Sequence, residues 1–195
     1  MTTFYLIRHA SNDYLVQNKI AGWLPKIHLN EKGRSEAGHL ASRLAHEPIV
    51  AIYSSPLERS VETAQPLADI LRQKVRISEG LGEIRFGDWT DQSVPGLDED
   101  PNWRRWNSFR SGTQAPEGDI MIEAQARIIR EMLRLREIHP SEAIALVTHG
   151  DPIKAAVAYF MGAPLDLFLR IEISPASVSV IALDQDRPRI LKVNG

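Results

Sequence analysis

Near its start the chain contains the stretch Phe4-Tyr5-Leu6-Ile7-Arg8-His9. Near the other end a stretch of the same design follows, Ala145-Leu146-Val147-Thr148-His149-Gly150. In both stretches an apolar run leads within a residue or two to a histidine. Unbroken apolar runs of this length are typical of strands buried on both faces of a parallel sheet. We therefore expect two neighbouring strands that deliver His9 and His149 to the same edge of a sheet.

The rest of the chain alternates between strand and helix patterns. Short apolar runs predict strands, and apolar residues spaced three and four apart predict helices with one buried face. Strands are expected over residues 3–7, 49–53, 75–77, 143–148, 177–180 and 189–193, and helices over residues 30–46, 56–72, 119–138 and 151–161. This order predicts an α/β fold in which a mostly parallel sheet carries helices on both faces, a three-layer α/β/α sandwich.

One helix start is predicted in detail. Ser55 is expected to be the N-cap, Pro56 to take the first helical position, and Glu58 to close a capping box. This helix follows the second strand directly, so its N-terminus is expected at the same sheet edge as the histidines.

Two arginines lie close to the first histidine. Arg8 precedes His9, and Arg59 falls in the first turn of the helix after the second strand. Arg59 either pairs with Glu62 or Thr63 on the helix face, or joins Arg8 around a phosphoryl group, for which guanidinium is the best bidentate ligand. Two fixed positive charges would also favour the neutral, nucleophilic imidazole at His9.

The two histidines favour phosphate chemistry carried on an imidazole. A single histidine at a strand end is more often a structural hydrogen-bonding residue, but two at equivalent strand ends change that balance. One ring can attack phosphorus while the other holds the transferring oxygens. Metal ligation is the alternative. The six histidines show neither HxH nor HExxH spacing, and Arg8 would repel a cation, so we expect no metal and no cofactor.

Composition limits the class of protein. The 195 residues suffice for one domain with a sizeable core. The 23 Lys and Arg against 25 Asp and Glu argue against nucleic acid or an anionic membrane as the main partner. No apolar run approaches the roughly 18 residues of a membrane span, and no signal peptide is recognised. The chain has no cysteine, which excludes disulfides and thiolate catalysis. We expect a cytoplasmic globular protein.

Residues 79–118 depart from the alternating pattern. They are rich in glycine and proline and contain Trp89, Trp103 and Trp106. About 40 residues seldom fold alone, so we expect a lid or insertion within a single domain over residues 1–195.

Five segments, in order along the chain, resemble the motifs of the histidine phosphatase superfamily, the phosphoglycerate-mutase-like group with an Arg-His-Gly motif. They are Leu6-Ile7-Arg8-His9-Ala10, Gly22-Trp23 with Leu29-Asn30-Glu31-Lys32-Gly33, Ser54-Ser55-Pro56-Leu57-Glu58-Arg59-Ser60-Val61-Glu62-Thr63-Ala64, Leu81-Gly82-Glu83-Ile84-Arg85-Phe86-Gly87-Asp88-Trp89 and Val147-Thr148-His149-Gly150. Each segment is weak evidence alone. Together they cover nearly the whole chain and imply a phosphoglycerate-mutase-like fold.

The resemblance implies a role for each matched residue. His9 would become phosphohistidine, while Arg8, Arg59 and His149 would hold the phosphoryl oxygens. Glu83 would protonate the leaving oxygen and later activate water, which a partly buried carboxyl can do near neutrality. Further substrate contacts would come from the following positions: Asn12, Ala21, Gly22, Trp23 and Gly150.

Several positions depart from the family pattern. Ala10 replaces a glycine, which is tolerated if its φ is negative. Ser11-Asn12 replaces Glu-Thr or Glu-Ser, which leaves the substrate contacts there open. Asp151 stands where Gly or Asn is frequent, and we interpret it as a helix-end charge that complements the dipole. Trp103-Arg104-Arg105-Trp106 either reaches an anionic or aromatic substrate or, as we favour, forms an amphipathic turn that packs both tryptophans.

These observations predict a metal-independent phosphomonoester hydrolase that acts on a small phosphorylated metabolite through phosphohistidine. A phosphoglycerate-mutase-type phosphotransferase is the first alternative, although such enzymes are typically longer. A non-catalytic module that binds a phosphorylated ligand is the second. We expect no nucleic acid or membrane partner, and a monomer or a homodimer.

Overall fold

The computed structural model describes residues 1–184 and 187–195. The strands are β1 Thr2–Arg8, β2 Ile49–Ser54, β3 Val75–Ile77, β4 Ala143–Thr148, β5 Val178–Leu183 and β6 Pro188–Lys192. The α-helices are α1 Asp13–Val16, α2 Glu31–Leu44, α3 Glu58–Leu71, α4 Pro101–Ser108, α5 Met121–Ile138 and α6 Gly150–Met161. Short 3-10 helices are η1 Glu79–Leu81, η2 Gly87–Trp89, η3 Pro95–Leu97 and η4 Leu165–Arg170.

The strands form one mixed sheet with the order β3-β2-β4-β1-β5-β6. The strands β3, β2, β4 and β1 run parallel, and β5 and β6 are antiparallel to their neighbours. The two histidine strands are neighbours, as predicted, and Arg8 pairs with Thr148 in their register. His9 and His149 therefore leave the sheet side by side at its carboxyl edge.

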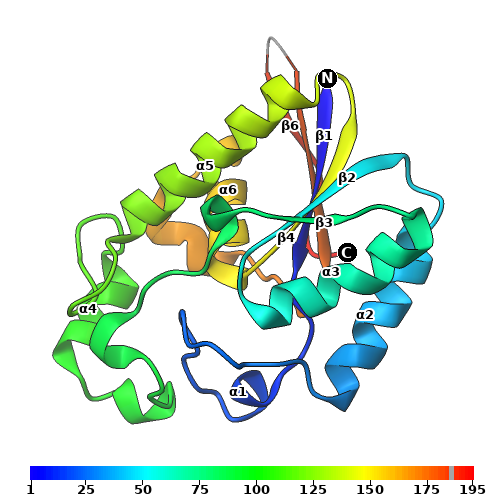
Figure 1. Cartoon of the computed structure of the whole chain (residues 1–195). Helices are drawn as coiled ribbons and strands as arrows, with labels where there is room; N and C mark the ends of the chain where they lie inside the picture. Colours follow the sequence, from blue (N-terminus) through cyan, green and yellow to red (C-terminus); the bar gives the residue numbers. More distant parts are fainter. Residues whose placement is uncertain (185–186) are drawn as a thin grey trace.

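Helices cover both faces of the sheet, with α2 and α3 on one side and α5 and α6 on the other (Figure 1). Successive residues of β1 serve opposite faces. Leu6 packs in the cluster that includes residues of α5 and α6, whereas Ile7 packs in the cluster that includes residues of α2 and α3. This alternation follows from the two-residue period of a strand. The predicted three-layer α/β/α sandwich is confirmed.

The predicted capping box at the start of α3 is wrong. The helix begins at Glu58, and its N-cap residue Leu57 makes no side-chain cap bond. Ser55 instead continues the line of β2, where its N–H donates to the carbonyl of Val147 at 2.9 Å. Its hydroxyl lies 2.8 Å from Nε2 of His149. The Ser-Pro pair therefore belongs to the connection between strand and helix, where the Ser55 hydroxyl contacts His149 and also accepts from the N–H of Leu57 at 3.4 Å.

Residues 79–118 lie beside α5 and α6 at the carboxyl end of the sheet (Figure 1). Trp89, Trp103 and Trp106 share one apolar cluster with Met121 of α5 and with residues of α6 and η4. The ring of Trp106 is fully buried, and the rings of Trp89 and Trp103 meet edge to face. The favoured interpretation of the Trp103–Trp106 turn, in which both tryptophans pack inward, agrees with this burial.

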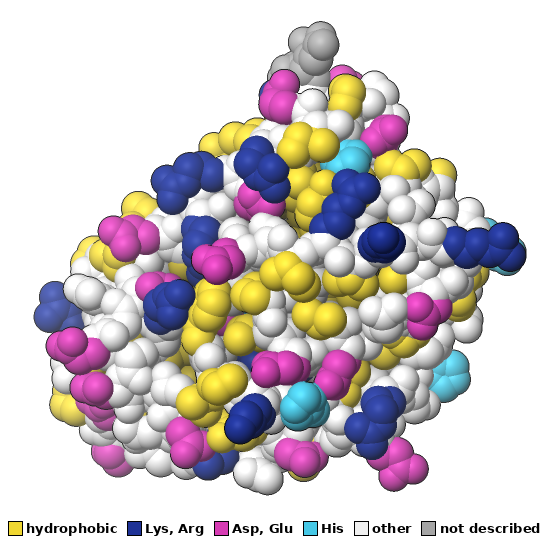
Figure 2. Space-filling model, in the orientation of Figure 1, with side chains coloured by type: hydrophobic (Ala, Val, Ile, Leu, Met, Phe, Trp, Pro, Cys, Tyr) yellow, Lys and Arg dark blue, Asp and Glu magenta, His cyan; other side chains and the backbone are white. Residues whose placement is uncertain are grey.

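The surface carries mixed charge on the face drawn in Figure 2, where acidic and basic side chains are interspersed rather than gathered by sign. None of the helices in the described part of the chain combines the length and apolarity that crossing a membrane requires.

Candidate active site

A cavity of about 230 Å³ opens at the carboxyl ends of the parallel strands. Its wall contains Arg8 and His9 from the end of β1, Arg59 from the first turn of α3, and Glu83 from the segment after η1. The first turn of α6 contributes Gly150 and Asp151. Four of the five residues with expected catalytic roles therefore line one cavity, and His149 lies directly beside it.

His9 is held in one tautomer by the backbone carbonyl of the next residue. The side chain is 3% exposed, and Nδ1 lies 2.8 Å from the carbonyl oxygen of Ala10. A carbonyl oxygen can only accept, so Nδ1 carries the ring proton and Nε2 keeps its lone pair. Ala10 lies outside the positive-φ region, so the replacement of the family's glycine brings no backbone strain.

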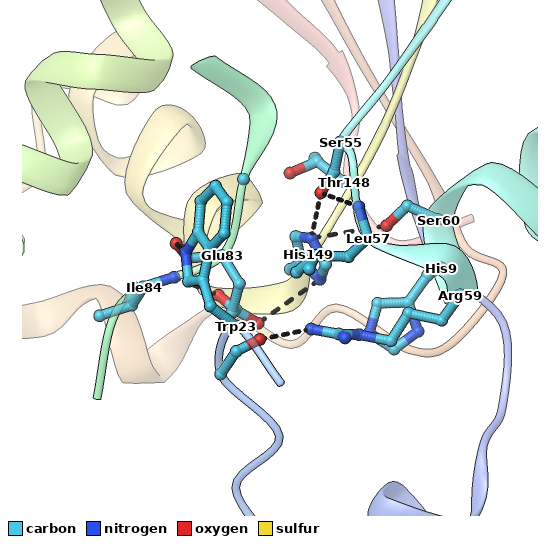
Figure 3. A network of polar contacts seen from close by, with 12 residues as sticks. His9, Trp23, Ser55, Leu57, Arg59, Ser60, Glu83, Ile84, Thr148 and His149 are labelled. Carbon is cyan, nitrogen blue, oxygen red and sulfur yellow. Dashed lines mark hydrogen bonds and ion pairs between the residues drawn. The ribbon is translucent and has the colours of Figure 1, made fainter. Parts of the chain in front are cut away.

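The two arginines carry polar atoms without partners. Arg59 is 1% exposed and donates from Nη2 to the carbonyl of Gly22 at 2.8 Å, but its Nε and Nη1 find no acceptor among the described residues (Figure 3). Arg8 donates from Nη1 to the carbonyl of Ile173, and in the described part of the chain its Nε has no acceptor. Buried N–H groups rarely remain unsatisfied. A phosphoryl group would bring the oxygen acceptors that these guanidinium groups lack.

Two glycines shape the path of these arginines. Gly22 has a φ of +49°, a conformation that L side chains rarely adopt, and from it presents its carbonyl to Arg59. At Gly150 a Cβ atom would lie 3.3 Å from Nε of Arg8. A side chain at this position would therefore crowd the Arg8 guanidinium, which glycine avoids.

His149 lies between a hydroxyl and a carboxylate, and Figure 3 shows its ring between Ser55 and Glu83. Its Nε2 is 2.8 Å from Oγ of Ser55 and its Nδ1 is 3.7 Å from Oε2 of Glu83. When the Ser55 hydroxyl donates to Nε2, Nδ1 bears the ring proton and can offer it to an oxygen in the cavity. The rings of His9 and His149 stand 5.2 Å apart, edge to face.

Burial keeps both histidines neutral. It holds the pKa of His9 well below the usual value, and the positive charge of Arg59 acts in the same direction. The pKa of His149 is lowered for the same two reasons. The sequence-based expectation of a neutral His9 is confirmed, although desolvation contributes more than the arginine charges that suggested it.

Glu83 titrates near neutrality. Burial, together with the negative charge of Asp151, raises its pKa to about 7, against the opposing charges of Arg59 and Arg8. Its side chain is 14% exposed, and Oε1 accepts from the N–H of Ile84 at 3.0 Å. A carboxyl group of this kind can both donate and accept a proton at physiological pH.

The backbone of Glu83 is fixed from behind by two side chains. Nε1 of Trp23 donates to its carbonyl oxygen at 2.5 Å, and Nη2 of Arg127 donates to the same oxygen at 2.9 Å. Nη1 of Arg127 also donates to the carbonyl of Gly82 at 2.8 Å. These bonds set the position from which the Glu83 carboxyl enters the cavity.

The other expected substrate residues divide into two groups. Asn12, Ala21, Gly22 and Gly150 line the cavity. Oδ1 of Asn12 caps α1 by accepting from the N–H of Leu15, so its amide N–H₂ is the part left for a ligand. Trp23 does not line the cavity. Its ring lies beyond Glu83, and the guanidinium of Arg85 stacks 4.0 Å from the ring centroid.

Sequence inspection missed several residues of the site. Ser55 was expected only as a helix cap, and nothing in the sequence singled out Arg110 as a cavity residue. Thr63 had only been considered as a partner for the Arg59 side chain. Its hydroxyl donates to the backbone carbonyl of Arg59 at 2.7 Å and accepts from the N–H of Ala10 at 2.9 Å. Thr63 therefore ties the start of α3 to the loop that carries His9.

In residues 1–184 and 187–195, no group of three or more His, Cys, Asp or Glu side chains is arranged to hold a metal ion. The positive charges in the cavity wall belong to arginines and to Lys19, which pairs with Asp91 at 2.7 Å.

A pair of buried, neutral histidines and two arginines at the carboxyl edge of an α/β sheet are the features of an enzyme of phosphoester hydrolysis or phosphoryl transfer. The chain belongs to branch 1 of the histidine phosphatase superfamily, whose family model matches residues 4–195. The resemblance inferred from the five sequence motifs is confirmed.

The relatives of the chain carry the names of both phosphatases and mutases. The chain is 29% identical over its full length to phosphoserine phosphatase 1 of Hydrogenobacter thermophilus, of which it covers 92%. It is 30% identical to the 2,3-bisphosphoglycerate-dependent phosphoglycerate mutase of Thermoplasma acidophilum, over 93% of this chain and 88% of the relative. The structure of a mycobacterial glucosyl-3-phosphoglycerate phosphatase with bound VO₃ superposes with a TM-score of 0.89, at 26% identity and 99% coverage of both chains.

Proposed function

We propose that this protein is a metal-independent phosphomonoesterase that acts on a small phosphorylated metabolite through a phosphohistidine at His9. One observation carries the proposal. The lone pair on Nε2 of His9 is free, because Nδ1 donates to Ala10, and it lies in a cavity with the unsatisfied N–H groups of Arg8 and Arg59. A nucleophile and an anion clamp thus share one site.

In the first step, Nε2 of His9 attacks phosphorus and forms a P–N bond. The bond between phosphorus and the ester oxygen breaks, and its electron pair goes to the leaving oxygen. Glu83, with its pKa of about 7, donates the proton that turns this oxygen into an alcohol. Arg8, Arg59 and Nδ1 of His149 donate hydrogen bonds to the phosphoryl oxygens as their charge spreads.

In the second step, the Glu83 carboxylate takes a proton from water, whose oxygen attacks phosphorus. The P–N bond breaks, its electron pair returns to Nε2 of His9, and inorganic phosphate leaves. Glu83 ends protonated, ready for the next ester. The cycle therefore needs one group that alternates between acid and base, which a carboxyl with a pKa near neutrality can do.

A mutase is the alternative that the 30% identical phosphoglycerate mutase favours. It would use the same first step, but an alcohol of a second substrate would accept the phosphoryl group in place of water. Release of inorganic phosphate from a panel of phosphorylated metabolites, with and without 2,3-bisphosphoglycerate, separates the two. Phosphate release without added bisphosphoglycerate supports the phosphatase. Isomer formation that requires it supports the mutase.

The phosphoenzyme is the direct test. Rapid quenching with a labelled substrate is expected to trap an adduct that is labile in acid and stable in alkali, and His9→Ala should abolish it. Turnover should persist in EDTA, and vanadate should inhibit as a mimic of the five-coordinate transition state. An adduct that survives in His9→Ala, or activity that EDTA abolishes and Mg²⁺ or Zn²⁺ restores, would refute the proposal.

Light scattering will decide between monomer and homodimer.

A further inference from the structure

A second pair of charged residues lines the same cavity. Nη1 of Arg110 donates to Oδ2 of Asp151 at 3.0 Å. Arg110 follows α4 in the 79–118 segment, and Asp151 lies in the first turn of α6. The catalytic steps proposed above use neither residue.

Arg110 is fixed in place. It is 4% exposed, Nη2 donates to Oδ1 of Asn107 at 2.7 Å, and its guanidinium lies over the rings of Trp106 and Phe168. A buried cation of this kind needs a partner, and Asp151 supplies it. The ion pair with Arg110 therefore explains the role of one carboxylate oxygen of Asp151, Oδ2.

The second oxygen of Asp151 is unaccounted for. The side chain keeps 22% exposure, and among the described residues a hydrogen-bond donor is found for Oδ2 only. Besides Glu83, Asp151 is the one carboxylate among the described residues that line the cavity. Asp151 therefore brings a carboxylate with one uncommitted oxygen to the wall of a cavity that also holds Arg8 and Arg59.

Asp151 lies close to the residues that are proposed to hold the phosphoryl group, namely Arg8, Arg59 and His149. It follows His149 by two residues, so their Cα atoms are at most about 7.6 Å apart. Gly150, between them, lies against Arg8. A carboxylate at this place repels a phosphate ester unless the ester itself brings a positive charge. In a 2-aminoalkyl phosphate, the ammonium lies only two carbons from the ester oxygen and can reach a group this near.

We propose that Asp151, held by Arg110, is a binding site for a primary ammonium group on the leaving part of the substrate. The substrate class is then 2-aminoalkyl phosphates, of which O-phosphoserine and phosphoethanolamine are examples. The inference rests on the proposed function for the position of the phosphoryl group. The competing view, in which Asp151 serves only to neutralise Arg110, predicts no discrimination by ligand charge.

Two ligands isolate the ammonium. O-phosphoserine and 3-phosphoglycerate share a phosphate, a carboxylate and a three-carbon chain, and they differ in an ammonium against a hydroxyl. Calorimetric titration of the full-length His9→Ala variant measures binding without turnover. O-phosphoserine is expected to bind about 10- to 100-fold more tightly, as a charge-assisted hydrogen bond provides. Phosphoethanolamine against 2-hydroxyethyl phosphate repeats the comparison without a carboxylate.

The same titrations in His9→Ala with Asp151→Asn assign the effect. The amide keeps an oxygen for Arg110 but has no charge, so the preference should fall to less than about threefold. Asp98→Asn, which removes an exposed carboxylate from the 79–118 segment that also carries Arg110, should leave the preference unchanged. Asp151→Asn also changes the electrostatic environment of Glu83, but this change affects the binding of both ligands alike. It therefore cancels in the ratio of the two affinities.

Equal affinities in His9→Ala would overturn the inference without any Asp151 variant, so a folding defect in that variant cannot protect it. A preference that survives Asp151→Asn would overturn it as well. The proposed function is tested separately, by wild-type turnover of p-nitrophenyl phosphate and trapping of phosphohistidine. Turnover with equal affinities refutes the ammonium site alone, and a binding preference without turnover refutes the phosphatase alone.

Discussion

At the scale of the residue, the environment of Glu83 sets its chemistry. An ordinary glutamate is ionised at pH 7 and cannot protonate a leaving group. Here burial and the neighbouring Asp151 raise the pKa to about 7, while Arg59 and Arg8 keep it from rising further. The same carboxyl can thus be protonated in one step and ionised in the next.

Glu83→Gln keeps the shape of the side chain but removes the transferable proton. Turnover of an alkyl phosphate should fall by about 10²- to 10⁴-fold. An aryl ester such as p-nitrophenyl phosphate has a better leaving group, so its phosphorylation step should be affected less. Burst kinetics should show a preserved burst followed by a slow steady state. Wild-type rates on both esters would exclude Glu83 as the acid and make Asp88 or Asp151 the next candidates.

The pH dependence follows from the same pKa. In the proposed mechanism the acid form of Glu83 serves the first step, so kcat/KM for an alkyl phosphate should decline as the pH rises through about 7. The neutral form of His9 is not limiting there, because its pKa is lowered. The aryl ester should show a much weaker decline. An equally steep decline for both esters, or one that persists in Glu83→Gln, would contradict the assignment.

Asp151→Asn should move this decline to lower pH. The charge of Asp151 raises the pKa of Glu83, and its removal leaves Arg59, Arg8 and the N–H of Ile84 to lower it. Profiles of kcat/KM for an alkyl phosphate in the variant and the wild type check this. A decline that stays at the same pH would show that burial alone sets the pKa.

At the scale of the element, the residues of the site come from the ends of strands and the first turns of helices, not from their interiors. His9 and Arg8 come from the end of β1, His149 follows β4, and Arg59 lies in the first turn of α3. Parallel strands bring their carboxyl ends to one edge, so residues far apart in the chain meet there. The helix that follows each strand must begin at a fixed residue, because its first turn lies next to the site. The residue that caps the helix therefore helps to keep the site in place.

Asn30 provides a test of one such cap. Its Oδ1 accepts from the N–H of Gly33 at 2.9 Å at the start of α2. Asn30→Ala should lower the free energy of unfolding by about 0.5–2 kcal/mol with little effect on kcat, because α2 contributes no residue to the cavity wall. Urea denaturation measures it. Asn102→Ala at an exposed position of α4 is the matched control and should change stability by less than about 0.5 kcal/mol.

At the scale of the whole molecule, the 79–118 segment shares its apolar cluster with α5, α6 and η4. A lid that packs in this way should unfold together with the sandwich as one cooperative unit. Three of the four tryptophans lie in the segment, so their fluorescence reports on it. The helices α2, α3, α5 and α6 dominate the far-ultraviolet circular dichroism. The two signals therefore follow different parts of the protein.

The two transitions in urea are expected to coincide. Trp106→Ala, which empties a fully buried site, should lower the free energy of unfolding by about 3–5 kcal/mol and shift both midpoints together. A fluorescence transition that precedes the circular dichroism transition would mean that the segment unfolds as a unit of its own.

The sequence by itself determined the order of the six strands and the four longest helices, and it indicated that Arg8, His9, Arg59 and His149 would meet at one edge of the sheet. These features depend on local periodicity and on residue types at strand ends, which a chain displays without its fold. The family motifs added Glu83, whose position in a loop carries no local signal of its own.

Only the tertiary structure decided the partners of polar groups. Ser55 contacts His149, which lies 94 residues further along the chain, and the N-cap position of α3 falls at Leu57 instead. Trp23 supports Glu83 from outside the cavity, and Arg110 joins Asp151 inside it. The physical reason is that each hydroxyl, guanidinium or carboxyl group has several possible partners in the sequence. Burial removes water as a partner, and the group that the fold brings within about 3 Å takes its place.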